Sequence, residues 1–173
     1  MTTVLEYIER ARAQGDLSTL LAAIPYTQFM GMSCAVEDGD LITTMRYSPH
    51  LIGNPSLPAL HGGTLGALME SAAAFKLLWA SETAVLPKTI TITIEYLRPA
   101  RPVDTYARAV ITRQGRRVAS LRVEAYQEDR ASPCATANVH FLIKRETDGA
   151  QVPGGPGGGG PDEGPPGSIA STS

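Results

Sequence analysis

Residues 61–80 constrain the fold of this chain more than any other stretch. Their sequence is His-Gly-Gly-Thr-Leu-Gly-Ala-Leu-Met-Glu-Ser-Ala-Ala-Ala-Phe-Lys-Leu-Leu-Trp-Ala. Large apolar side chains recur at helical spacing with Ala and Gly between them, so we expect a helix that is apolar nearly all round. The rest of the chain must therefore wrap it. Glu70 lies in its middle, where a buried carboxylate costs free energy unless it is paired, protonated or used in chemistry.

The start of this helix has a different character, because His61, Gly62 and Gly63 precede its apolar part. The first N–H groups of a helix have no partner within it and lie at the positive end of the helix dipole. This end therefore favours negative charge. An acid and an anion-stabilising site are two parts of a site for acyl transfer, which needs a base or nucleophile and a donor to the carbonyl oxygen.

The segments around the helix alternate with a period of two, which is typical of strands. After the helix a run of apolar side chains alternates with polar ones: Ile90, Ile92, Ile94 and Tyr96 against Thr89, Thr91, Thr93 and Glu95. We expect strands over residues 32–37, 41–47, 89–96, 105–113, 117–127 and 134–144, the first two joined by a turn at Asp38-Gly39. Clean alternation predicts an antiparallel sheet with one covered face, and a sheet curled around the helix gives an α+β fold.

Three regions follow from the pattern along the chain. Residues 1–25 form a helical extension that we interpret as packing, and residues 26–145 form the domain. Residues 48–60 are rich in Pro and Gly, so a loop is expected there. Residues 146–173 form a tail in which positions 153–168 contain eight Gly and five Pro, and we expect it to be disordered because it offers little apolar surface to bury.

Composition excludes several classes of protein. The 173 residues have a formal net charge of −2, which gives no reason to expect nucleic acid, although the part up to Arg145 holds 15 basic against 13 acidic residues and leans towards an anionic ligand. Two cysteines without a CxxC and three histidines without metal-ligand spacing predict no metal and no cofactor. No signal peptide and no apolar run of about 18 residues are present, so a cytoplasmic protein without a membrane partner is expected.

Taken together, three motifs resemble the hotdog-fold acyl-CoA thioesterases. They are His-Gly-Gly opening a small-residue helix, an acid nine positions after the His, and a strand that ends Ile-Glu-Tyr-Leu-Arg-Pro-Ala-Arg over 94–101. The nearest subgroup is the PaaI-like and 4-hydroxybenzoyl-CoA thioesterases with the acid in the central helix. The resemblance covers residues 31–144. It implies a hotdog fold, a homodimer or homotetramer, and hydrolysis of an acyl-CoA thioester to a free acid and CoA.

The same resemblance implies roles for individual residues. Glu70 would act as nucleophile or general base, the Gly62 N–H would polarise the thioester carbonyl, His61 would orient it, and Thr89 would hold the attacking water. The family has an Asn six residues before the His, and that place is Pro55 here. Asn54 is one residue away and is carried as a further candidate.

The substrate-binding candidates are Gly63, at the helix start, and Arg98 and Arg101, which would meet the nucleotide phosphates. Each catalytic candidate also has a purely structural alternative. Glu70 could pair with a cation, His61 could cap the helix, and Thr89 could be an ordinary strand residue. Arginines at strand ends are usually solvated. Two other functions also remain open, namely a hotdog dehydratase or hydratase, and a non-catalytic acyl-CoA-binding protein.

Helix geometry predicts that the site is shared between two chains. Gly62 and Glu70 are eight residues apart, which is roughly 12 Å along a helix axis at 1.5 Å per residue. A carbonyl within hydrogen-bond distance of the Gly62 N–H therefore cannot also lie within attack distance of the same chain's Glu70. If both act on one carbonyl, they come from different subunits, as in a two-fold dimer.

Overall fold

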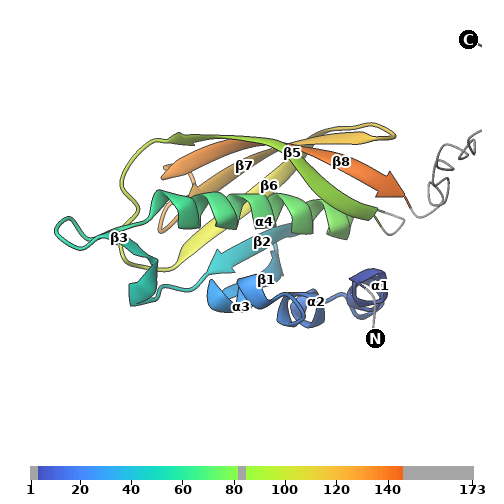
Figure 1. Cartoon of the computed structure of the whole chain (residues 1–173), viewed down its shortest axis with the longest axis horizontal. Helices are drawn as coiled ribbons and strands as arrows, with labels where there is room; N and C mark the ends of the chain where they lie inside the picture. The colour runs from blue at the N-terminus through green and yellow to red at the C-terminus, as the bar shows by residue number, and fades with distance from the viewer. Residues whose placement is uncertain (1–3, 82–84, 146–173) are drawn as a thin grey trace, which may run out of the picture.

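The computed structural model of this chain describes residues 4–81 and 85–145. A six-stranded antiparallel sheet has the order β1-β2-β6-β7-β8-β5, which leaves β1 and β5 at its two edges. The strands are β1 (Met32–Glu37), β2 (Asp40–Met45), β5 (Val85–Tyr96), β6 (Thr105–Gln114), β7 (Val118–Tyr126) and β8 (Ala135–Arg145). The long helix α4 (Gly62–Ala80) lies along the concave face of the sheet (Figure 1). The expected α+β hotdog arrangement is confirmed.

Small side chains let the sheet approach the helix closely. Six alanines on β6, β7 and β8 face α4 and are at most 2% exposed: Ala107, Ala109, Ala119, Ala125, Ala135 and Ala137. Opposite them, Leu68, Met69 and Ala73 of the helix are fully buried. The nearly all-round apolar character of α4 is explained by this wrapping, because each buried aliphatic side chain contributes about 1.5–3 kcal/mol when it leaves water.

The N-terminal extension covers the helix side of the molecule. It consists of α1 (Val4–Gln14), α2 (Ser18–Ala22) and α3 (Pro25–Phe29), which lie on the same side of the sheet as α4 (Figure 1). Side chains from α1 and α2, such as Ile8 and Leu20, belong to the same hydrophobic core as α4. The extension therefore packs into the same core as the rest of the domain, and the division at residue 25, the first residue of α3, stays a prediction. The predicted tail over 146–173 lies outside the described residues.

The segment before α4 is more regular than the sequence suggests. A loop was expected over 48–60, but a 3-10 turn (Pro49–Leu51) leads into β3 (Ile52–Asn54), which pairs with β4 (Ala59–Leu60). Backbone bonds fix this small hairpin: the Leu60 N–H donates to the Ala100 carbonyl at 2.9 Å, and the His61 N–H to the Leu51 carbonyl at 2.8 Å. The start of α4 is therefore held between the hairpin and the loop that follows β5.

A β-bulge in β5 breaks the alternation that the sequence predicts. Thr89 pairs with Phe141, but Thr91, two positions later, pairs with the very next residue, His140, so Ile90 is the extra residue. Before the bulge Thr89 lies on the helix side with its partner Phe141, and after it Ile92 and Ile94 take that side. The expected face for Thr89, opposite the isoleucines, is therefore wrong. One inserted residue moves a side chain to the other face of the sheet, since the period is two.

Candidate active site

Glu70 meets Thr89 where α4 passes beneath the edge strand. The Thr89 hydroxyl donates a hydrogen bond of 2.6 Å to Oε1 of Glu70. Glu70 is half-buried, less than its apolar surroundings in the sequence suggest, and Thr89 is exposed. A carboxylate with one oxygen held by a hydroxyl and the other free can accept a proton or attack an electrophile.

The start of α4 leaves one N–H group free. His61 is the N-cap, and its Nδ1 accepts a 2.9 Å hydrogen bond from the Gly63 N–H. The N–H groups of Thr64 and Leu65 both donate to the His61 carbonyl, so they are also occupied. Within the part of the chain that the structure describes, the Gly62 N–H has no hydrogen-bond partner. This geometry leaves the Gly62 N–H available to a ligand oxygen, whereas the Gly63 N–H is already used.

The His61 cap also fixes the ring. Because Nδ1 accepts a hydrogen bond, the neutral ring carries its proton on Nε2, which is a donor. The predicted alternatives for His61, cap or orienting group, are therefore compatible, since the cap uses only one ring nitrogen.

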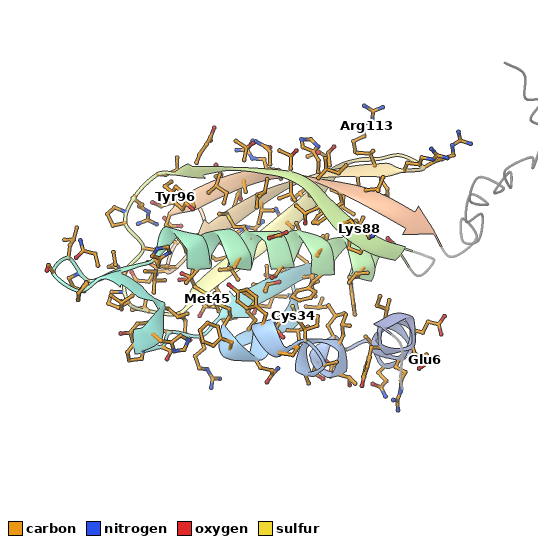
Figure 2. All side chains as sticks on the ribbon, in the orientation of Figure 1. Glu6, Cys34, Met45, Lys88, Tyr96 and Arg113 are labelled. Carbon is orange, nitrogen blue, oxygen red and sulfur yellow. The ribbon has the colours of Figure 1, made fainter. Side chains whose placement is uncertain are left out.

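Tyr96 also belongs to the candidate site, although no motif in the sequence singles it out. Its hydroxyl donates a 2.8 Å hydrogen bond to the Gly62 carbonyl, and a Cβ added at Gly62 would come within 3.2 Å of its ring. Figure 2 shows Tyr96 over the first turn of α4. A Cβ at Gly66 would likewise meet Ile94 at 3.0 Å. The signal available in the sequence is that Tyr96 shares a strand face with Ile92 and Ile94, which pack on the helix.

Asn54 is the last residue of β3, directly before the turn into β4. Its side-chain oxygen accepts hydrogen bonds from the N–H groups of Ser56 and Leu57, at 3.0 and 3.3 Å. Among the described residues it has no hydrogen bond to α4. The neighbouring Gly53 packs directly on His61, because a Cβ there would lie 2.7 Å from the His61 Cα. The structure thus places the hairpin beside His61 and uses the Asn54 oxygen for the turn.

The two arginine candidates lie on the loop after β5, and both have protein partners. Arg98 donates from Nε and Nη2 to the carbonyls of Pro133 and Ser132. Arg101 forms an ion pair of 2.6 Å with Glu128. Both side chains remain exposed. Their guanidinium groups are close to the turn between β7 and β8, and the structure does not bring them together with Glu70.

The described residues do not favour catalysis by a cysteine thiolate or by a metal ion. Burial raises the pKa of the Cys34 thiol to about 11, and burial also raises the pKa of Cys134, so neither is a ready thiolate near neutral pH. No cluster of three or more His, Cys, Asp or Glu side chains suited to a metal occurs among the described residues. In the same part of the chain, no helix has the length and apolar character needed to cross a membrane.

Comparison with known proteins decides the family. Residues 54–142 match the family model described as the acyl-CoA thioesterase N-terminal domain. The chain belongs to this family. This thioesterase is 25% identical over 157 residues to the Escherichia coli protein named medium/long-chain acyl-CoA thioesterase YigI, an alignment covering 83% of this chain and 99% of the relative.

Solved structures agree with the fold. A Chromobacterium violaceum protein is 38% identical, with a TM-score of 0.66 over 79% of this thioesterase and 96% of that chain. A Bacillus halodurans protein, solved with CoA, shares the fold at 19% identity, with a TM-score of 0.65 over 82% of this chain and 91% of its own. The family match identifies a thioester hydrolase, rather than the dehydratase or the binding protein considered from the sequence. The PaaI-like subgroup stays a prediction.

Proposed function

We propose that this thioesterase hydrolyses acyl-CoA with Glu70 as its catalytic carboxylate and the Gly62 N–H as the donor to the thioester carbonyl. The contact between Thr89 and Glu70 supports this most directly, because a threonine hydroxyl beside a half-buried carboxylate offers a place for water at the acid. The unpartnered Gly62 N–H supplies the second element. One such donor is worth roughly 3 kcal/mol of barrier in other enzymes.

The reaction then has a simple proton balance. Glu70 takes a proton from a water that Thr89 helps to hold, and the oxygen of that water bonds to the thioester carbon. Negative charge moves onto the carbonyl oxygen and is stabilised by the Gly62 N–H. When the carbon–sulfur bond breaks, the CoA thiolate leaves and takes the proton from Glu70. In the alternative route Glu70 itself attacks, and water cleaves the resulting anhydride; both routes use the same residues.

The site is proposed to form between two subunits. The distance along α4 of roughly 12 Å separates Glu70 from the Gly62 of its own chain. Strand β5 lies at the edge of the sheet. Its Ile90 is 55% exposed, and so is Leu97, which directly follows the strand. An exposed edge with apolar side chains favours pairing with another strand. Two β5 strands paired about a two-fold axis would bring each Glu70 towards the other subunit's Gly62.

The remaining candidates take supporting roles. The Nε2–H of His61 would donate to the carbonyl end of the substrate, and Gly63 would support this because its N–H binds Nδ1 and so fixes the ring. Asn54 retains its amide N–H groups for a contact with substrate. Arg98 and Arg101 would bind CoA phosphates only if they exchange their present partners for them. The activity is assigned to residues 26–145, with the N-terminal extension completing the core.

The class of acyl group is testable. The name of the Escherichia coli relative suggests a medium or long aliphatic chain, whereas the PaaI-like resemblance suggests an aryl group. We favour the aliphatic class. A thiol-release assay over hexanoyl-, decanoyl-, palmitoyl-, benzoyl- and phenylacetyl-CoA measures kcat/KM for each. The highest values on decanoyl- and palmitoyl-CoA are expected. Faster turnover of the two aryl substrates would contradict this assignment, and no turnover of any would contradict the proposed function.

A further inference from the structure

Gln127 directly follows β7 and has a buried side chain whose amide oxygen and nitrogen are both hydrogen-bonded. It is 6% exposed. Its Oε1 accepts the Arg101 N–H at 3.0 Å, and its Nε2 donates to the Arg101 carbonyl at 2.8 Å and to the Thr105 hydroxyl at 3.1 Å. An amide that bonds both the N–H and the C=O of one residue repeats the pattern of a neighbouring antiparallel strand. Gln127 therefore fixes the backbone of Arg101 in the loop after β5.

The bond to the Arg101 N–H is the one that this loop cannot replace. The Arg101 carbonyl has a second partner, because it also accepts the Val103 N–H at 2.8 Å. Among the described residues, the Arg101 N–H is bonded to Gln127 alone. Pro99 and Pro102, on either side, have no N–H with which to hold the loop. Without the Gln127 oxygen, the Arg101 N–H must turn towards water or another acceptor, since an unpartnered N–H costs free energy.

The same peptide group holds the start of α4 from its other side. The Arg101 N–H and the Ala100 carbonyl belong to one planar unit and point in opposite directions. The Ala100 carbonyl accepts the Leu60 N–H at 2.9 Å, and Figure 1 shows the loop after β5 beside the β3–β4 hairpin. Leu60 directly precedes His61, the N-cap of α4. A rotation of this peptide unit would therefore move the acceptor that holds the residue before the cap.

The side chain of Arg101 is held separately and less firmly. It forms its ion pair with Glu128, the residue after Gln127, and the two side chains are 57% and 74% exposed. Ion pairs this exposed contribute little to the free energy of unfolding. In contrast, Gln127, Ala100 and Leu60 are at most 6% exposed. We therefore attribute the position of this backbone to the buried amide of Gln127 and not to the ion pair.

We propose that Gln127 is a positioning residue for the start of α4. Its amide oxygen orients the peptide unit between Ala100 and Arg101, this unit holds Leu60, and Leu60 sets the place of the Gly62 N–H two residues later. Hydrogen bonds linked through one peptide unit also polarise and strengthen one another. The inference rests on the proposed role of the Gly62 N–H as donor to the thioester carbonyl.

Two substitutions distinguish the amide oxygen of Gln127 from the size of its side chain. Gln127→Met has a similar length but offers no oxygen to the Arg101 N–H. Gln127→Glu keeps an oxygen in the acceptor position. Ser81→Ala is the control, because it removes another buried hydrogen bond, of 2.6 Å to the Leu77 carbonyl, at the opposite end of α4. All variants are made in the full-length chain.

Two kinds of measurement are needed, because a loss of activity alone could follow from a loss of stability. Thiol release from decanoyl-CoA gives kcat and KM. Amide hydrogen exchange, followed by NMR, gives the exchange rate of the Leu60 N–H relative to that of the Val123 N–H in the centre of the sheet. A change in global stability affects both amides, whereas a local opening at the start of α4 raises the ratio.

For Gln127→Met we expect the exchange ratio to rise at least about tenfold. Its kcat should fall about fivefold, with KM within about twofold of wild type, as for a lost contact that acts mainly in the transition state. Gln127→Glu should keep kcat within about threefold of wild type, and Ser81→Ala should change neither kcat nor the ratio. A Gln127→Met variant with a wild-type kcat or a wild-type exchange ratio would overturn the proposal. Equal losses of kcat in the Met and Glu variants, or in Ser81→Ala, would overturn it as well.

Gly62→Pro in the same assay shows which proposal is at fault if activity persists. A wild-type kcat for Gly62→Pro would contradict the donor role of the Gly62 N–H, and the role of Gln127 would fall with it. A strong loss of kcat in Gly62→Pro, together with a wild-type kcat in Gln127→Met, would leave the proposed function intact and overturn only the positioning role of Gln127.

Discussion

The Thr89 hydroxyl donates a 2.6 Å hydrogen bond to Glu70 Oε1, and this contact joins an edge strand to the centre of the longest helix. The two residues are 19 positions apart in the sequence and meet only because β5 is bulged at Ile90. The bulge is therefore part of the site, as it aims the hydroxyl at the carboxylate. The hydroxyl orients Glu70 through Oε1, and among the described residues Oε2 has no hydrogen-bond partner.

Glu70→Gln tests the carboxylate itself. Glutamine keeps the size of the side chain and can still accept the Thr89 hydrogen bond, but it can neither take a proton from water nor attack a thioester. We expect kcat to fall by at least about a hundredfold, with a thermal midpoint close to wild type. Single-turnover thiol release and a melting curve measure the two quantities. A variant within about threefold of wild type, less than 1 kcal/mol in barrier, would remove Glu70 from the mechanism.

Two substitutions at Thr89 distinguish the role of its hydroxyl from the role of its β-branched shape in the strand. Thr89→Val keeps the β-branched shape and loses the donor to Glu70, so we expect kcat to fall about tenfold, in line with a hydrogen bond to a charged group. Thr89→Ser keeps the donor and should stay within about threefold of wild type. The comparison of the two variants at saturating substrate is the measurement. Equal activity of Ser and Val at this position would show that the hydroxyl has no role.

Tyr96 is expected to position the start of α4. Tyr96→Phe keeps the ring against Gly62 and removes the hydroxyl that donates to the Gly62 carbonyl. Because Tyr96 is 54% exposed, the free energy of unfolding should fall by less than about 1 kcal/mol. The expected effect lies in kcat, which should fall several-fold as the first turn loosens. A clear loss of stability with unchanged kcat would assign Tyr96 a purely structural role.

Asp40 binds Arg108 of β6 and Lys76 of α4, and its charge makes the free energy of unfolding depend on pH. It accepts hydrogen bonds from Arg108 at 2.6 Å and from Lys76 at 3.5 Å, and the Arg108 hydrogen bond lowers its pKa below the ordinary 3.8. Because the pKa of Asp40 is lower in the folded state, its carboxylate stabilises the fold fully above pH 3.8. This stabilisation is lost as the pH falls through the pKa of the folded state. Asp40→Asn should therefore cost about 1 kcal/mol near pH 7 and less below pH 3.8.

Urea unfolding at pH 7 and at pH 3 measures this difference. Asp38→Asn is the matched control, because Asp38 is exposed in the adjacent turn at φ 50°, which Asn tolerates. A cost for Asp40→Asn that is the same at both pH values would show that the carboxylate charge does not stabilise the fold.

Periodicity predicted the fold well, because wrapping one apolar helix in one antiparallel sheet is the main energetic demand of this chain. The helix expected over 61–80 is observed as Gly62–Ala80, and the turn at Asp38-Gly39 is confirmed by positive φ values at both residues. The Pro- and Gly-rich segment before the helix was less predictable. Its two short strands pair with each other, and the Leu60 N–H donates to the carbonyl of Ala100, which comes from the loop after β5.

The residue types of the candidate site could be proposed from the sequence, but their contacts could not. His61, Gly62 and Glu70 follow from local helix chemistry, which needs no knowledge of the sheet. Thr89 was identified only through the family resemblance, since strict alternation puts it on the wrong face and a bulge leaves no clear mark in the sequence. Tyr96 binds the carbonyl of Gly62, 34 positions away, so only the folded arrangement shows that it lies in the candidate site.

The proposed site between two subunits rests on one feature of α4: Gly62 and Glu70 of the same chain are too far apart to act on one carbonyl. The decisive experiment mixes two inactive proteins, Glu70→Gln and Gly62→Pro. Proline at this first helical position is tolerated by the helix and removes the N–H. Gly62→Ala is the matched control, since it adds the same Cβ against Tyr96 and keeps the N–H.

Thiol release is measured after subunit exchange, which mass-tagged chains demonstrate independently. A heterodimer has one site that combines the intact Glu70 of one chain with the intact Gly62 of the other. We expect recovery to about a quarter of wild-type activity per chain in an equal mixture with random pairing. Gly62→Ala alone should retain more activity than Gly62→Pro. No recovery in a mixture with proven exchange, or full activity in an isolated monomer, would contradict the shared site.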